Sequence, residues 1–277
     1  MSKKFEINDL NKLYKPANSS VKNENGLVTI IAGSKLFHGP ALVALKVASR
    51  VVDMVFLSSP EPSIGNIAEN LKSKLSSFIW IPWEDTADYV KKSDAVLIGP
   101  GFMRYGSEKD THLQNVDYCD EFCRQSKKIT QDFLTGYPDK KWVIDGGSLQ
   151  VMKPEWIPEN SIITANEKEY KYLFGSLDQS EASKKYKCVI VRKGRITTVS
   201  SADSFVEVHG GNAGLTKGAT GDVQAGLTVA LLSKNDPFLA AAAASFIIKM
   251  ASDSLFSRVG FNYNADDLVD EIPQIMR

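Results

Sequence analysis

The chain has 277 residues, of which 43% are hydrophobic and 24% are charged, an ordinary composition for a globular protein. Its 33 basic and 33 acidic side chains give a formal net charge of zero, so no overall positive field marks it as a nucleic-acid binder. A site for an anion must therefore be built from backbone amides and a few local lysines.

The N-terminal arm, residues 1–21, is polar and lacks the apolar segment of a signal peptide. The longest apolar run, residues 238–248, is too short to span a bilayer, so no membrane partner is expected. Cys119 and Cys123 are expected one turn apart in a polar helix, without the partners of a zinc site. We expect them and Cys188 to be unpaired thiols of a cytoplasmic protein.

Short β-branched runs alternate with helical patterns along the chain. Strands are predicted at residues 27–32, 53–57, 78–81, 95–98, 142–144 and 162–163, and a hairpin pairs 187–192 with 196–200. Helices are predicted at 40–52, 221–233 and 237–255. This alternation predicts an α/β fold, a three-layer α/β/α sandwich around a mostly parallel, doubly wound sheet, in a single domain spanning 1–277.

Glycines and polar residues gather where the predicted strands end. The four turns are Gly33-Ser34, Gly99-Pro100-Gly101, Asp145-Gly146-Gly147-Ser148 and Thr164-Ala165-Asn166. Ligands of such folds bind outside the carboxyl ends of the strands. Each turn alone could be a plain connector, but the four together indicate a site.

The most informative segment runs from Gly211 to Asp222. Gly218 and Gly221 allow a sharp turn and a close approach to a ligand. The helix that starts there points free amides at the turn Ala219-Thr220-Gly221, which predicts an anion site. Asp222 lies in the first helical turn, where the dipole favours its ionised form, as a general base requires. The alternative is an ordinary acid at a helix start beside a glycine-rich loop.

Two further segments are each open to two interpretations. Asn166 and Glu169 have the spacing of a capping box, but Asn166 could face a substrate while Glu169 orders metal-bound water. The hairpin Lys193-Gly194-Arg195-Ile196-Thr197 could cradle a nucleotide or be an exposed tip. Asp145, at a strand end, is equally consistent with a catalytic acid and a helix cap.

Two nucleotide-binding motifs are absent. No Walker loop occurs, and the run from Gly99 to Arg104 is not a dinucleotide fingerprint because Arg104 stands where the last glycine should be. A hydride-transferring Rossmann enzyme is therefore disfavoured.

Taken in order, these segments resemble the ribokinase-like superfamily, and more closely its NAD(P)H-hydrate dehydratase branch. Residues 211–226 are similar to the branch's Gly-Asn-Pro-Gly…Gly-Gly-Thr-Gly-Asp-Val-Leu-Ala-Gly. Asn166-Glu167-Lys168-Glu169 is similar to the superfamily's Asn-x-x-Glu. Further support comes from Ile98-Gly99-Pro100-Gly101, from Gly33-Ser34 followed by Gly39-Pro40-Ala41, and from Val191-Arg192-Lys193-Gly194.

The resemblance implies an enzyme that phosphorylates the hydroxyl of hydrated NADH or NADPH with ADP or ATP and Mg²⁺, after which phosphate loss restores the ring. Asp222 would be the base, Glu169 would act on Mg²⁺ through water, and a homo-oligomer is expected. The hydrate pocket would comprise Pro40, Gly101, Asn166 and Asp222, and the nucleotide site Lys193, Gly194, Arg195, Ile196, Thr197, Gly218 and Gly221.

Several positions depart from the pattern of the branch. Asn166 stands where many members have histidine, Asp145-Gly146-Gly147 lacks the second acid of Asp-Ala-Asp, and Ala219 replaces a glycine. Too few residues precede Lys22 for the epimerase domain often fused to these enzymes, so none is expected. The alternatives are a ribokinase-like kinase of a small alcohol, such as a vitamin precursor or sugar, and a nucleotide-binding regulator without activity.

Overall fold

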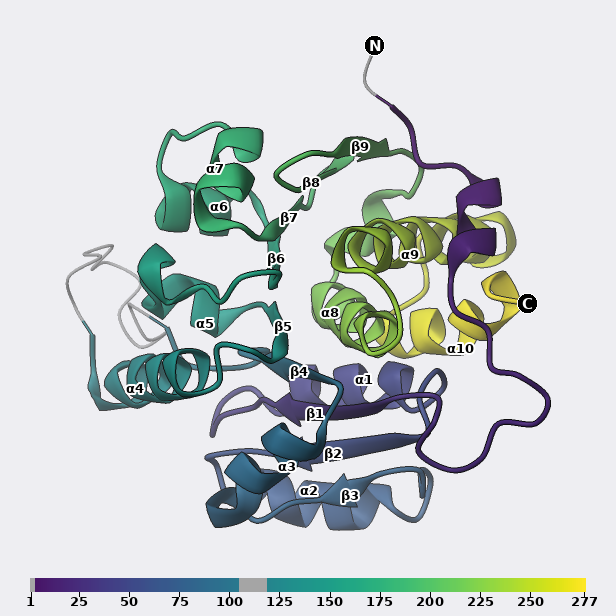
Figure 1. The fold of residues 1–277 in the computed structure, drawn as a ribbon. Coiled ribbons are helices and arrows are strands. Elements are labelled where there is room, and N and C mark those ends of the chain that lie inside the picture. The colour runs from purple at the N-terminus through teal and green to yellow at the C-terminus, as the bar shows by residue number, and fades with distance from the viewer. Residues whose placement is uncertain (1–2, 105–118) are drawn as a thin grey trace.

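The computed structural model describes residues 3–104 and 119–277. One nine-stranded sheet runs through it in the order β3-β2-β1-β4-β5-β6-β7-β8-β9 (Figure 1). Neighbouring strands are parallel from β3 to β7, and β8 and β9 continue the sheet antiparallel. The strands are β1 Leu27–Ile31, β2 Met54–Ser58, β3 Ile79–Trp80, β4 Ala95–Ile98, β5 Lys141–Ile144, β6 Ile162–Ala165, β7 Val189–Arg192, β8 Thr197–Ser200 and β9 Phe205–Val208.

Helices cover both faces of the sheet, which confirms the predicted three-layer α/β fold (Figure 1). Buried side chains of the first face come from α1 Gly39–Ala48, α2 Ser63–Leu71, α8 Thr220–Leu232, α9 Pro237–Val259 and α10 Ala265–Ile275. Those of the second face come from α3 Thr86–Lys92, α4 Glu121–Gly136, α5 Gly147–Val151, α6 Glu167–Phe174 and α7 Gln179–Tyr186.

Successive strand residues enter opposite core layers because side chains alternate across a sheet. Val143 belongs to the first layer, whereas its neighbours Trp142 and Ile144 belong to the second, and all three are fully buried. This two-sided burial explains why the strands read as continuous apolar runs.

The long helix α9 extends beyond the apolar run predicted from the sequence. By length and composition alone it could cross a membrane, with a mean hydropathy of 1.4 in its most apolar window. However, 67% of that window is buried inside the protein, against the sheet and its neighbouring helices. Within the described residues α9 therefore serves as a central core helix.

The prediction of three unpaired thiols is wrong for two of them. Cys119 and Cys123 form a disulfide, and Cys119 precedes α4 instead of lying inside it. Asp120 caps the helix by accepting a hydrogen bond from the Cys123 amide at 2.8 Å, which brings the two cysteines together across the first turn. Cys188 is free and buried, and burial raises the pKa of its thiol to about 12.

Residues 3–5 of the N-terminal arm run along the edge of the sheet beside β9. The Phe5 amide donates to the Glu207 carbonyl at 3.0 Å, and the Glu207 amide donates to the Lys3 carbonyl at 2.9 Å. The Phe5 ring packs 5.5 Å from that of Phe246 on α9. The opposite edge is β3, which has only two residues.

Candidate active site at the carboxyl ends of the strands

Turns after β1 and β4 lie against each other at the carboxyl edge of the sheet. The Gly33 amide donates to the Pro100 carbonyl at 2.8 Å. Gly101 has a φ of +72°, and a Cβ placed on it would lie 2.8 Å from the Phe37 carbonyl oxygen and 3.3 Å from Cβ of Pro40. Only glycine fits this approach. The structure therefore brings together Gly101 and Pro40, two of the residues predicted to bind the hydrate.

The turn after β5 has no room for the acid that the resemblance leads one to expect. A Cβ on Gly147 would lie 2.2 Å from the carbonyl oxygen of Phe102. The backbone of the 99–102 turn thus occupies the space of a side chain at position 147. The missing second acid is a packing consequence of how closely the two turns approach.

Asp145 directly follows β5 and forms an ion pair with Lys193, which directly follows β7. Their Oδ1 and Nζ atoms are 2.9 Å apart, and the Asp145 side chain is only 3% exposed. Thr164 on the intervening strand β6 donates to the same oxygen at 2.8 Å. Asp145 does not cap the next helix, since α5 has Gly146 at its N-cap and no side-chain cap. The helix-cap interpretation is therefore wrong.

Burial and charge act in opposite directions on the Lys193 ammonium. Burial lowers the pKa of Lys193, but the carboxylates of Asp145 and Glu169 outweigh it, and the pKa is raised overall. Lys193 is therefore a permanent cation at the centre of an acidic cluster, not the free cation of a hairpin tip.

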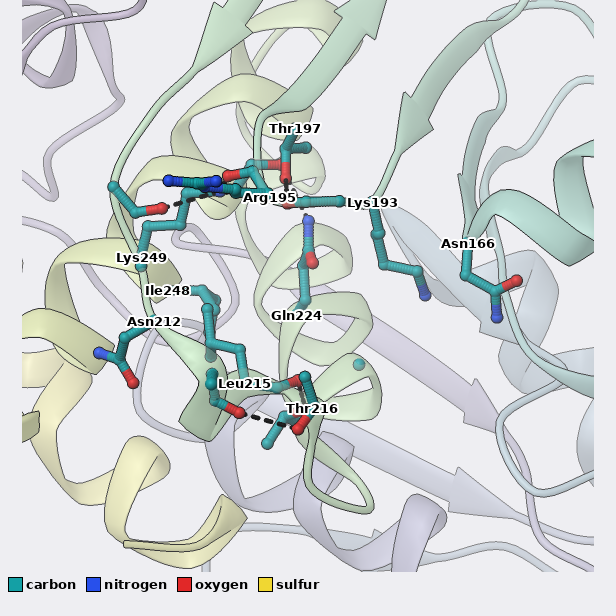
Figure 2. Close-up of a pocket in the computed structure, with 17 residues that line it drawn as sticks. Asn166, Lys193, Arg195, Thr197, Asn212, Leu215, Thr216, Gln224, Ile248 and Lys249 are labelled. Atoms are coloured by element: carbon teal, nitrogen blue, oxygen red, sulfur yellow. Dashed lines mark hydrogen bonds between the residues drawn. The ribbon is translucent and has the colours of Figure 1, made fainter. Parts of the chain in front are cut away.

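Asn166 and Glu169 form the capping box that their spacing predicts. Oδ1 of Asn166 accepts hydrogen bonds from the amides of Lys168 at 2.9 Å and Glu169 at 3.0 Å, and Oε2 of Glu169 accepts from the Asn166 amide at 2.9 Å. Gln150 donates to the other Glu169 oxygen at 3.2 Å. Burial raises the pKa of Glu169. The cap interpretation is confirmed, and Asn166 also lines the cavity described below (Figure 2).

The start of α8 carries no side-chain cap, unlike that of the neighbouring long helix α9, which Asp236 caps. Ala219 occupies its N-cap in the left-handed region, with φ +67°, and no side chain caps the helix. The Thr220 hydroxyl does not cap the helix either, because it donates to the carbonyls of Leu215 and Lys217. A Cβ on Gly221 would lie 3.4 Å from Nζ of Lys193, so the lysine ammonium stands directly over this turn. Open amides and a nearby cation make an anion site.

Asp222 follows this turn, and its acidity differs from the expectation. Burial and the negative charge of Asp145 raise the pKa of Asp222 to about 7, although Lys193 opposes the shift. The helix dipole was expected to favour the ionised form, but burial and Asp145 outweigh that effect. A carboxyl that titrates near neutrality is well matched to accept a proton from a hydroxyl and later release it.

A cavity of about 610 Å³ lies between the β7–β8 hairpin, the loop before α8, and helices α8 and α9 (Figure 2). Ile196 and Gly218 are not among its lining residues; Ile196 is 46% exposed. Pro40, Gly101 and Asp222 are not among them either, although Asp222 directly follows Gly221. Of the residues predicted for nucleotide and substrate, its wall contains Lys193, Gly194, Arg195, Thr197, Gly221 and Asn166.

Sequence reasoning missed Lys249, which joins two walls of the cavity. Its side chain is buried, and Nζ donates to the carbonyls of Arg195 at 2.8 Å, Gly210 at 3.0 Å and Gly194 at 3.3 Å. Burial lowers the pKa of Lys249. The signal was visible in the sequence, since Lys249 is the one basic residue in the run 237–255.

The Gly-Asn-Ala-Gly run is also held in place by hydrogen bonds to distant parts of the chain. Oδ1 of Asn212 accepts from the Gly214 amide at 3.0 Å and from the Tyr263 hydroxyl at 2.7 Å. Lys217 donates to the carbonyls of Phe261 and Tyr263. Asn212 and Lys217 therefore fix the loop that precedes the anion turn.

In residues 3–104 and 119–277, no group of three or more His, Cys, Asp or Glu side chains is arranged to hold a metal ion. Acids nevertheless outnumber bases around the anion turn, where Asp145, Glu169 and Asp222 surround Lys193. Such an excess of negative charge suits a cation that arrives with a phosphate and is bound through water.

The chain is similar to known proteins over most of its length. Residues 28–274 match the family model described as NAD(P)H-hydrate dehydratase. A bifunctional NAD(P)H-hydrate repair enzyme of Methanocaldococcus jannaschii is 33% identical over 97% of this chain and 52% of its own length. An ADP-dependent (S)-NAD(P)H-hydrate dehydratase of Nitrosopumilus maritimus is 27% identical, with 100% of this chain and 98% of that protein covered.

Two solved structures share the fold. A ribokinase-like superfamily protein of Enterococcus faecalis has a TM-score of 0.80 at 18% identity, with 99% of this chain and 95% of that chain covered. The ADP/ATP-dependent NAD(P)H-hydrate dehydratase of Bacillus subtilis, co-crystallised with ATP and Mg²⁺, has a TM-score of 0.75 at 19% identity, with 99% and 97% covered. The chain spans about half the length of the bifunctional relatives that it matches.

Proposed function

The chain belongs to the NAD(P)H-hydrate dehydratase family and has its ribokinase-like fold, and from this premise we propose that it converts the S-form hydrate of NADH or NADPH back to NADH or NADPH, using ADP or ATP. The observation that carries the proposal is the position of Asp222. A carboxyl with a pKa of about 7 directly follows an uncapped helix start that faces the Lys193 ammonium. This arrangement can deprotonate a hydroxyl and stabilise a transferring phosphoryl group at the same place.

The proposed reaction has two steps. The nucleotide lies in the cavity with its terminal phosphoryl group at the start of α8, and Asp222 accepts the proton of the hydrate's hydroxyl. The hydroxyl oxygen bonds to the phosphorus as the bond from phosphorus to the nucleotide breaks. Phosphate then leaves with the electron pair of the C–O bond, a proton leaves the neighbouring ring carbon, and the ring double bond is restored.

Charge at the anion turn decides how the phosphoryl group is held. The open amides of α8 and the Lys193 ammonium face the developing negative charge, and Lys193 is fixed there by Asp145. Mg²⁺ bound with the nucleotide would spread the remaining phosphate charge. Glu169 would meet it through water, because both of its oxygens already accept hydrogen bonds from the protein.

The hydrate would lie on the other side of Asp222, towards Pro40 and Gly101, with Asn166 between the two ligands. Support comes from the contact between Gly101 and Pro40 and from Gly99, where an added Cβ would lie 2.1 Å from the Asp145 carbonyl oxygen. These contacts link the hydrate side of the site to the acidic cluster.

A homo-oligomer is part of the proposal and can be checked by light scattering.

Recovery of absorbance at the reduced-nicotinamide band tests the function. Purified protein is mixed with the S-form hydrate, Mg²⁺, and ADP or ATP in turn. Recovery with at least one nucleotide is expected, and omission of nucleotide should abolish it. No recovery with either nucleotide would overturn the proposal, and accumulation of a phosphorylated product would instead indicate a kinase.

A further inference from the structure

Gln224 is a polar side chain buried in the wall of the cavity. It is 8% exposed and lies on α8 three residues after Gly221, so the two residues share a face of the helix. Figure 2 shows it rising from α8 between the Lys193–Thr197 hairpin and the wall that carries Asn212 and Leu215. The family motif has leucine at this place, which would be the simpler choice for a buried position.

The hydrogen bonds of Ser245 fix which way the Gln224 amide points. The Ser245 hydroxyl donates its only proton to the Ala241 carbonyl at 2.8 Å. Its oxygen must therefore accept from the group 2.9 Å away on Gln224, and that group is the Nε2 amide nitrogen. The carboxamide oxygen Oε1 consequently faces the other way.

The oxygen Oε1 of Gln224 opens onto the cavity. It has no hydrogen-bond partner within the described residues. It is not fully buried either, because Oγ of Ser161 is the only fully buried side-chain polar atom without a partner among those residues. A side chain that is nine-tenths buried therefore presents one free acceptor to whatever fills the cavity. An acceptor in such a position selects a ligand that carries an N–H or O–H donor, because a ligand without one leaves it unpaired.

We propose that Gln224 determines nucleotide specificity, accepting at Oε1 a hydrogen bond from a hydroxyl or amino group of the bound nucleotide. The inference rests on the proposed function only for the nature of the ligand. Two groups of an adenine nucleotide offer this donor, the ribose hydroxyls and the exocyclic amine. The amine is replaced by a carbonyl acceptor in inosine nucleotides.

Calorimetric binding of four nucleotides tests the proposal. ADP, 2′-deoxy-ADP, 3′-deoxy-ADP and IDP are titrated into the wild-type protein and into Gln224→Leu. The wild type is expected to bind one analogue roughly ten- to a hundredfold more weakly than ADP, and the variant should lose that penalty while the other ratios stay unchanged. The analogue affected identifies the group that Gln224 binds. If the wild type binds all four alike, or the variant keeps the same ratios, the proposal is wrong.

Two further variants keep the test decisive if Gln224→Leu fails to fold. Ser245→Ala removes the partner that orients the amide, so the amide can turn its nitrogen to the cavity and the penalty should shrink; an undiminished penalty contradicts the inference. Thr228→Val is the matched control, since Thr228 lies one turn further along α8, is buried, and does not line the cavity. Binding is measured without turnover, so a protein that discriminates among nucleotides but restores no hydrate contradicts the proposed function alone.

Discussion

Nζ of Lys193 lies 2.9 Å from Oδ1 of Asp145, a carboxylate that is 3% exposed at the end of β5. The pair spans β6, whose Thr164 hydroxyl donates to the same oxygen. Lys193 thus has a fixed position beside Gly221 before any ligand binds. Asp145 also acts on Asp222, because its negative charge opposes ionisation of the second carboxyl.

Asp145→Asn is expected to move the pH profile of the enzyme to lower pH. In the wild type, kcat/KM should rise with pH and reach half its plateau near pH 7, the pKa of the Asp222 base. Removing the Asp145 charge lowers the pKa of Asp222. The Lys193 ammonium, which has then lost its partner Asp145, lowers it further, whereas the charge of Glu169 still raises it. Structural damage alone would lower the plateau without moving the profile, and a shift to higher pH would contradict the charge argument.

Asp222→Asn should lower turnover by about 10² to 10⁴, because the amide cannot accept the proton. Formation of NADH or NADPH is followed by absorbance, and folding by circular dichroism. Activity close to that of the wild type would exclude Asp222 as the base.

The same variant should change the pH dependence of stability. The Asp222 pKa is about 7 in the folded state against 3.8 for the unperturbed group, so the folded state binds more protons between these values and loses stability as pH rises through them. Asparagine does not titrate. The unfolding free energy of the variant minus that of the wild type should therefore increase from pH 4 to pH 7, as measured by denaturant titration.

Ala219→Gly is expected to stabilise the protein by about 0.5 to 1 kcal/mol. Ala219 has a φ of +67°, a conformation that costs a residue with a Cβ about 1 to 2 kcal/mol, of which the greater flexibility of unfolded glycine cancels a part. Equilibrium denaturation measures the change. Ala230→Gly, in the interior of the same helix, is the matched control and should destabilise.

Lys249→Met should weaken nucleotide binding more than it slows turnover. The three carbonyls that Lys249 binds belong to the β7–β8 hairpin and to the loop after β9, and both segments line the cavity, so their release should raise the KM for nucleotide roughly tenfold. The loss of these hydrogen bonds should also cost about 2 kcal/mol of stability. Lys128→Met, at a solvent-exposed ion pair, should change both quantities little. An unchanged KM in Lys249→Met would show that the two walls hold their positions without it.

Much of the fold could be predicted because the strands carry local, unambiguous patterns. Ala95–Ile98 is apolar throughout and Val189–Arg192 is apolar up to its last residue, and the predicted hairpin at Lys193 is present. The strand Phe205–Val208 was missed, since it has only four residues and the charged Glu207 interrupts its apolar run. The amphipathic helix Ala265–Ile275, which contains Pro273, was missed as well.

The site was predictable in its parts but not in its electrostatics. The turns and Asp222 were visible as motifs, whereas the pKa of Asp222 depends on its burial and on Asp145, 77 positions earlier in the chain. Lys193 was expected to face a nucleotide, but no local pattern could show that it binds Asp145. The Cys119–Cys123 disulfide was likewise not predicted. It forms because α4 begins only at Glu121, whereas both cysteines were expected inside the helix.

The N-terminal arm has a consequence for how copies of this protein behave beside one another. An uncovered edge strand exposes unpaired amides and carbonyls that can recruit a strand from a second molecule. Here the backbone of Lys3 and Phe5 occupies those groups of Glu207 on β9, and the other edge ends in a strand of only two residues. Both edges of the sheet are thereby blunted, so a segment that takes no part in the proposed chemistry protects the protein against strand-to-strand aggregation.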